Sequence, residues 1–213
     1  MTAYLPDPTT FLAYTVACLI LFATPGPDMS LFLSQTVAGG RRSGLAAMAG
    51  ATVGSCVHSI VAALGLSAVI AASTTAFTIL KVVGAMYLLY LAVQAIRQGS
   101  ALTLQSGRPP PSLWRTFVLG LGINLTNPKV VLFFVTFLPQ FVSASDPHAS
   151  GKMLVLGLYF VVVSVPLAIV MVLLAERFIA VVTRRRWVMR ALDYSFAAIF
   201  AFFAVRIAFM PSR

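Results

Sequence analysis

Residues 11–37 read FLAYTVACLILFATPGPDMSLFLSQTV. This stretch is long enough to cross a membrane, because about 20 apolar residues span the roughly 30 Å hydrocarbon core of a bilayer. Near its middle stands Thr24-Pro25-Gly26-Pro27, and a proline cannot donate a backbone hydrogen bond inside a helix. The stretch therefore predicts a membrane-spanning helix that is broken near the midplane of the bilayer.

The composition of the whole chain is that of a membrane protein. Of its 213 residues, 60% are hydrophobic and 9% charged, whereas about a quarter of a typical soluble domain is charged. The apolar runs predict six spans, at about residues 11–37, 43–67, 75–96, 113–142, 153–175 and 188–209. They leave no room for an ATPase domain, and the chain has no G-x-x-x-x-G-K-[ST] loop. We expect an all-α membrane protein that forms a single domain over residues 1–213, is not an enzyme, and holds no cofactor or metal.

The basic residues predict the orientation of the spans. The formal net charge of +10 would suggest a nucleic-acid partner in a soluble protein, but here the arginines lie between the apolar runs. One side of the predicted bundle carries Arg41, Arg42, Arg97, Arg108, Arg115, Arg177, Arg184, Arg185, Arg186 and Arg190. The other side carries Lys152, Arg213 and at most Arg206. Because basic loops stay in the cytoplasm, we expect both termini outside and no nucleic-acid partner.

A second broken span suggests an internal repeat. Residues 27–33 align with residues 128–134 through a shared proline, leucine and phenylalanine, and Asn127-Pro128 interrupts the fourth span as the prolines interrupt the first. The halves would cover about 1–100 and 113–213, joined by a proline-rich linker at about 97–112. Three spans in each half would make the halves inverted, with both breaks near the midplane, as in many transporters.

Each break predicts polar groups inside the membrane. A proline frees the carbonyl one turn earlier, and that carbonyl is then open to a ligand. Asn127 before Pro128 is typical of a helix N-cap, so the following half-helix would direct free N–H groups at an anion.

Asp28 and Lys129 each follow a break, and a charge at that depth costs several kcal/mol unless it is paired or hydrated. Because Lys129 would stand at a helix N-terminus, it needs an anionic partner, which is either Asp28 or a substrate carboxylate. A permanent Asp28–Lys129 bridge between the halves is the structural alternative. Asp28 is the only carboxylate predicted near the midplane, so it is the candidate for proton coupling.

Two further side chains in the spans have both a structural and a functional interpretation. Lys81 lies in the third span, where it either pairs internally or serves transport. Gly50, Gly54 and His58 recur every four residues, which predicts a small-residue stripe that permits close helix packing. His58 is then either a packed structural histidine or part of the cavity.

Four motifs carry a family resemblance: residues 24–28 (TPGPD), 81–90 (KVVGAMYLLY), 124–129 (NLTNPK) and 139–141 (PQF). In their order and spacing the whole chain resembles the lysine exporter family, in its resistance-to-homoserine/threonine branch. The resemblance implies a small transporter in the bacterial inner membrane that exports amino acids or related metabolites, driven by the proton gradient.

The resulting hypothesis is a secondary exporter of neutral amino acids, in which the broken helices bind opposite ends of a zwitterion. The spans lack extra acidic residues for a cationic side chain, which favours neutral substrates over lysine. The candidate substrate-binding residues are Pro25, Gly26, Pro27, Asp28, His58, Lys81, Asn124, Asn127, Pro128 and Lys129. The alternatives are a channel or metal-ion carrier, and a redox carrier that uses Cys18 and Cys56. Membrane lipid is an expected partner, and a homo-oligomer is left open.

Overall fold

The computed structural model describes residues 6–66, 112–143 and 146–175 without a gap, together with Tyr4 and single residues within 75–97 and 177–205. Every element in this described part is helical, which confirms the all-α class there. The third and sixth predicted spans fall on the ranges of single residues, and Lys81 and most of the linker lie outside the described residues. The complete inverted repeat therefore stays a prediction.

The first broken helix is formed by α1 (Pro8–Ala23) and the beginning of α2 (Pro27–Val61). The Asp7 carboxylate caps α1 by accepting two backbone N–H groups of the first turn, at 3.1 and 3.0 Å. After α1, Thr24 and Gly26 adopt extended backbone conformations before α2 starts with a proline. The break predicted in the first span is confirmed.

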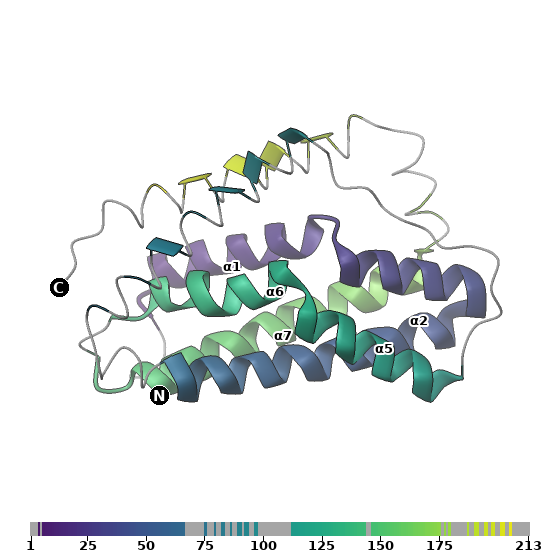
Figure 1. The fold of residues 1–213 in the computed structure, drawn as a ribbon, viewed down its shortest axis with the longest axis horizontal. Helices are drawn as coiled ribbons and strands as arrows, with labels where there is room; N and C mark the ends of the chain where they lie inside the picture. The colour runs from purple at the N-terminus through teal and green to yellow at the C-terminus, as the bar shows by residue number, and fades with distance from the viewer. Residues whose placement is uncertain are drawn as a thin grey trace.

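Gly40 divides α2 into two helical segments. Its φ of 74° and ψ of 179° are non-helical, and a positive φ is a conformation that glycine adopts without strain. Figure 1 shows the chain reversing its direction within α2, so that the second segment runs back beside the first. This segment continues into a π-helical turn, η2 (Ala62–Leu66). The reversal falls at the boundary predicted between the first two spans.

The second broken helix begins with α5 (Leu113–Thr126) and breaks at Asn127. The Asn127 side chain accepts the backbone N–H of Lys129 at 3.1 Å, as predicted for an N-cap. The helix axes before and after the break differ by 49°. Three elements follow without interruption: α6 (Pro128–Leu132), the π-helical η3 (Phe133–Phe137) and the 3-10 helical η4 (Leu138–Phe141).

Small residues bring the helices together around the breaks. A Cβ atom at Gly50 would lie 1.9 Å from the backbone oxygen of Phe117, and one at Gly120 would lie 2.0 Å from the backbone oxygen of Ala47. Helices α2 and α5 therefore cross in backbone contact, which confirms the predicted small-residue stripe. The long helix α7 (Ala149–Leu173) packs against α2 on another side.

An aromatic cluster fills the space between α1, η3, η4 and α7. It consists of Tyr14, Phe133, Phe134, Phe137, Phe141 and Phe160. The Tyr14 hydroxyl donates to the Leu156 carbonyl at 2.9 Å, so the buried phenol is satisfied. Together these rings fill the core of the bundle between the breaks and the end at which α1 starts.

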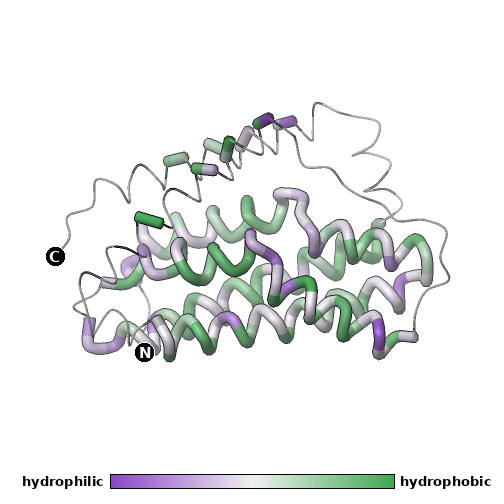
Figure 2. Tube along the Cα trace, in the orientation of Figure 1, coloured by the Kyte–Doolittle hydropathy of each residue, from purple (hydrophilic) through white to green (hydrophobic). Residues whose placement is uncertain are grey.

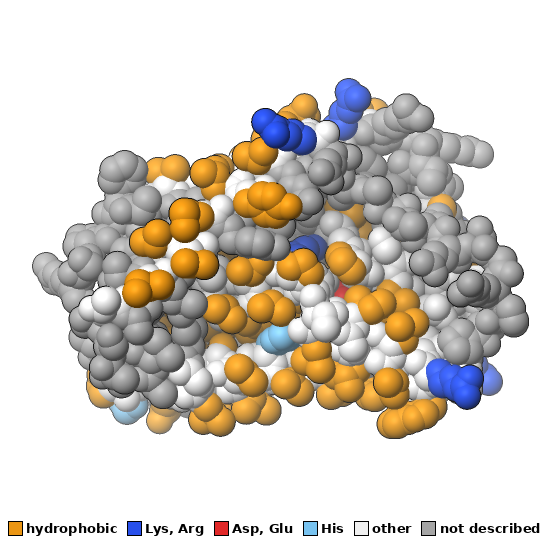
Figure 3. All heavy atoms as spheres, in the orientation of Figure 1, with side chains coloured by type: hydrophobic (Ala, Val, Ile, Leu, Met, Phe, Trp, Pro, Cys, Tyr) orange, Lys and Arg blue, Asp and Glu red, His pale blue; other side chains and the backbone are white. Residues whose placement is uncertain are grey.

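The outer surface of the described bundle is apolar as well. Trp114 is 70% exposed, and Leu12, Leu64 and Val162 are each more than 60% exposed. Hydrophobic residues recur along every helix in Figure 2, and hydrophobic side chains spread over the described parts of the face in Figure 3. An apolar surface of this extent suits lipid rather than water.

By length and composition alone, two described helices could each cross a membrane. These are residues 27–65, comprising α2 and most of η2, and α7. Residues 113–126 and 128–141 add a third if the bent pair is one span. Since Gly40 reverses the chain, the first of these supplies two shorter segments rather than one straight helix.

Candidate functional site

The two breaks lie against one another. The Lys129 side chain extends from the second break to the first, where its Nζ donates to the Thr24 carbonyl at 2.5 Å. It also passes over Gly26, where an added Cβ atom would lie 3.5 Å from Lys129 Nζ. The two breaks are thus joined by a direct contact between their residues.

Lys129 is stabilised by the end of a helix. Thr24 follows the last residue of α1, where backbone carbonyls lack helical partners and carry negative partial charge. A cation is favoured at that position even though it is disfavoured at the start of its own helix. The sequence predicted a carboxylate as the partner of Lys129. In the structure, the partner is the backbone carbonyl of Thr24.

Asp28 is held by an amide and not by the lysine. Its Oδ2 accepts from Asn124 Nδ2 at 2.8 Å, whereas its Oδ1 is buried and has no hydrogen-bond partner among the described residues. The Lys129 Nζ does not lie within 4.0 Å of the carboxylate oxygens, so the permanent bridge considered above is not formed. In the described part of the chain, the only such ion pair joins Asp146 and Lys152.

That pair joins the turn before α7 to the first turn of α7, away from the breaks. The hydrogen bond from Lys152 is the main cause that lowers the pKa of the Asp146 carboxyl below its usual value. Asp146 and Lys152 thus form the direct ion pair that Asp28 and Lys129 do not form.

Asn124 connects α5 to both segments of α2 at the second break. Besides bonding to Asp28, its side chain accepts from Ser55 Oγ at 3.4 Å. Its backbone carbonyl, which Pro128 frees, lies 3.3 Å from His58 Nε2 and also accepts the N–H of Asn127 at 3.1 Å. This carbonyl thus has contacts within the protein, and its binding of a ligand stays a prediction.

His58 has the packed position that one interpretation predicted. Its ring stacks on Phe134 with the centroids 5.5 Å apart, while its Nε2 contacts the Asn124 carbonyl. Gly54, one turn earlier, is equally constrained, since a Cβ atom there would lie 2.5 Å from Asn124 Oδ1. His58 is not among the residues that line the cavity.

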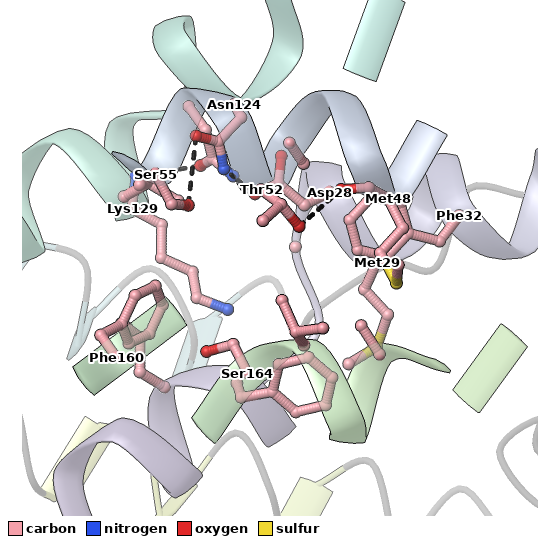
Figure 4. A pocket seen from close by; sticks show the side chains of 18 of the residues that line it. Asp28, Met29, Phe32, Met48, Thr52, Ser55, Asn124, Lys129, Phe160 and Ser164 are labelled. Carbon is pink, nitrogen blue, oxygen red and sulfur yellow. Dashed lines mark hydrogen bonds between the residues drawn. The ribbon is translucent and has the colours of Figure 1, made fainter. Parts of the chain in front are cut away.

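A cavity of about 80 Å³ lies between the breaks and α7. On the same measure one water molecule needs about 10–15 Å³, so the space suits a small molecule. Figure 4 shows side chains from α2, α5, α6 and α7 pointing into it. Its polar lining consists of Thr24, Asp28, Thr52, Ser55, Asn124, Asn127, Lys129 and Ser164. Its larger apolar side chains are Leu21, Phe22, Met29, Phe32, Met48, Phe160 and Met171.

The structure places half of the sequence-predicted site residues on the cavity wall. Gly26, Asp28, Asn124, Asn127 and Lys129 line it. The three prolines lie at the breaks and shape the wall without being part of it, whereas Lys81 is outside the described residues.

The sequence did not single out four further polar residues that also line the cavity: Thr24, Thr52, Ser55 and Ser164. Two signals were present in the sequence. Ser55 follows Gly54 in the small-residue stripe, and Ser164 stands two residues before the only proline in α7.

The described residues show neither a cluster of metal-ligating side chains nor a cysteine on the cavity wall. They contain no group of three or more His, Cys, Asp or Glu side chains that could bind a metal ion. Cys18 and Cys56 are both free thiols, and neither lines the cavity.

Comparisons with known proteins place the chain among membrane transporters. The family described as LysE type translocator matches residues 19–210. The chain is 30% identical over 190 residues to the homoserine/homoserine lactone efflux protein of Salmonella typhimurium, covering 89% of this chain and 91% of that protein. It is 33% identical over 152 residues to a membrane protein of Vibrio cholerae, covering 71% and 74% of the two chains. No solved structure matches the chain.

Proposed function

Because the chain belongs to the LysE type translocator family, we propose that it exports neutral amino acids or closely related small metabolites across the bacterial inner membrane. The family consists of transporters, so the chain is a membrane transporter and not an enzyme. Direction and substrate class are the parts of this proposal that require experiment.

One observation supports a zwitterionic substrate. The cavity contains a cation and an anion that do not pair with each other, Lys129 and Asp28. Buried charges of opposite sign normally pair, because an unpaired charge in a low-dielectric site is costly. A zwitterion supplies a carboxylate for the lysine and an ammonium group for the free Oδ1 of Asp28.

The apolar walls support small neutral side chains. Met29, Phe32, Met48 and Met171 surround the remainder of the cavity and offer no counter-charge to a cationic side chain. Two relatives, from Salmonella typhimurium and Salmonella typhi, are named homoserine/homoserine lactone efflux proteins. Homoserine is a neutral α-amino acid of suitable size, and we propose it as the first substrate to test.

We further propose six spans in two inverted halves, with both termini on the periplasmic side. Helix α1 with the first segment of α2 would form one crossing, and the second segment of α2 the next. Arg41, which follows the reversal at Gly40, lines the same hollow as Arg177 beyond the end of α7. These basic residues thus gather at one end, as cytoplasmic loops do.

The same charges suggest a route for proton coupling. Asp28 has one bonded and one free oxygen, and Lys129 is held by a carbonyl from which it could move. We propose that Asp28 binds the coupling proton, because the distance of the lysine from the carboxylate would change its proton affinity.

Transport into proteoliposomes tests the function directly. Purified protein would be reconstituted and given radiolabelled homoserine, threonine, leucine or lysine under an imposed pH gradient. We expect saturable, gradient-dependent accumulation of one or more neutral amino acids and no accumulation in protein-free liposomes. Flux that does not saturate would indicate a channel, and transport of lysine alone would contradict the neutral class.

A further inference from the structure

Ser164 on α7 has a hydroxyl group without a role in the described structure. Its Oγ is buried and has no hydrogen-bond partner there. A serine or threonine inside a helix commonly donates to the carbonyl four residues earlier, as Ser59, Thr52 and Thr136 do here at 2.8–2.9 Å. Ser164 lines the cavity and does not make that bond.

Lys129 faces this hydroxyl from another helix. Figure 4 shows the ammonium group of Lys129 and the Ser164 side chain directed toward one another across the cavity. An ammonium group has three N–H donors, and the Thr24 carbonyl uses one of them. Two lysine donors and the serine donor therefore have no acceptor among the described residues.

The chemistry of this corner favours an anion. The lysine and serine donors can both bind one carboxylate, and hydrogen bonds between charged groups are stronger than neutral ones. A substrate ammonium group placed there would instead meet the charge of Lys129. Asp28, whose Oδ1 is buried without a partner in the described structure, lies beside Asn124 and Thr52, which suits the ammonium end.

We propose that Ser164 and Lys129 form the carboxylate subsite, so that α7 positions the substrate together with the two broken helices. This assignment rests on the proposed function. It makes Ser164, which lies outside the sequence motifs, a determinant of substrate specificity. Ser164 would favour substrates with a free carboxylate over esters and lactones of the same amino acid, because a neutral carbonyl accepts a weaker hydrogen bond.

The test compares L-homoserine with L-homoserine lactone, which keeps the ammonium group but has no carboxylate. Proteoliposome transport of both would be measured for the wild type, Ser164→Ala and Ser164→Thr. We expect Ser164→Ala to lower kcat/KM for homoserine about tenfold to a hundredfold, the range for a hydrogen bond to a charged group. The lactone should lose less than about threefold, because it has no charged acceptor for the hydroxyl. Ser164→Thr keeps the hydroxyl and should retain most of the preference.

Ser59→Ala is the matched control. Ser59 is also a buried serine near α7, but it donates to the Ser55 carbonyl of its own helix and does not line the cavity. Its removal should affect both substrates equally and weakly. An equal loss of both substrates in Ser164→Ala, or no loss of either, would overturn the carboxylate assignment alone. If the wild type transported neither compound nor any other amino acid, both the proposed function and the carboxylate assignment would be wrong.

Discussion

The two breaks use the same residue type and are completed in different ways. Each half-helix after a break starts with a proline. At the first break, Gly26 provides no side-chain cap and the chain is extended from Thr24. At the second, Asn127 alone separates the helices, and its side chain caps the next turn.

The polar groups differ accordingly. The carbonyl freed at the second break is contacted by His58, whereas at the first break the Thr24 carbonyl depends on a lysine from the other half of the chain. Asp28, just after the first break, keeps one oxygen without a partner in the described structure. Each break is thus contacted by a side chain from the other half of the chain, His58 at the second and Lys129 at the first. The first break differs in that Asp28 beside it keeps an acceptor for a ligand.

Replacing Lys129 should have the largest effect, because this side chain serves both breaks. Lys129→Met keeps the length but removes the donor to the Thr24 carbonyl and the proposed donor to a substrate carboxylate. We expect no detectable transport of any amino acid, with normal membrane insertion. Lys152→Met, which removes the lysine paired with Asp146 outside the cavity, is the control and should transport normally. Normal transport by Lys129→Met would show that the first break functions without its partner.

Asn127→Leu tests whether the cap of the second break is needed. The variant removes the acceptor for the Lys129 N–H, a cap worth on the order of 1 kcal/mol, and should abolish transport while leaving insertion largely intact. Ser112→Ala removes the equivalent cap of α5 away from the cavity, so it should cost some stability but little transport. If the two variants transport equally well, the second break is a kink without a functional role.

Asp28→Asn should separate coupling from binding. An amide at this position can still accept from Asn124, so the local structure should be kept while the proton site is lost. We expect substrate-for-substrate exchange across liposomes to continue with a raised KM, because the amide oxygen still accepts from the ammonium group but carries no charge, and we expect no accumulation driven by a pH gradient. Uphill export at the normal rate would show that Asp28 is structural and that coupling, if present, lies elsewhere.

The sequence predicted the breaks and the helix stripe but not the complete cavity, for a physical reason. Proline and glycine act through the local backbone, so Pro27, Pro128, Gly50 and Gly54 indicate helix ends and close approaches wherever the chain is placed. The Lys129–Thr24 bond depends on which helix ends meet.

Ser164 was harder still to predict. A serine in an apolar span is usually satisfied by its own helix. Ser164 differs from Ser59 through its place on the cavity wall and its buried Oγ without a partner in the described structure, and neither feature can be read from the sequence.

Gly54→Ala should have the smallest effect and tests whether the two breaks are linked. Asn124 joins them, because it belongs to the second broken helix and donates to Asp28 after the first. A Cβ atom at position 54 would lie 2.5 Å from Asn124 Oδ1, so the amide must move and its bond to Asp28 should weaken. Gly122→Ala is the matched control, since nothing lies within 4 Å of its Cβ position.

Both changes gain the same helix propensity, about 1 kcal/mol, so their difference measures the overlap at Asn124. We expect Gly122→Ala to be neutral or slightly stabilising. Gly54→Ala should lose about 1–3 kcal/mol of stability through overpacking, and its pH-driven accumulation should fall more than its exchange. This partial loss would resemble Asp28→Asn, because both changes act on the same carboxylate. If Gly54→Ala instead lowered exchange and accumulation in equal proportion, Asn124 would support the packing of α5 without linking the second break to the first.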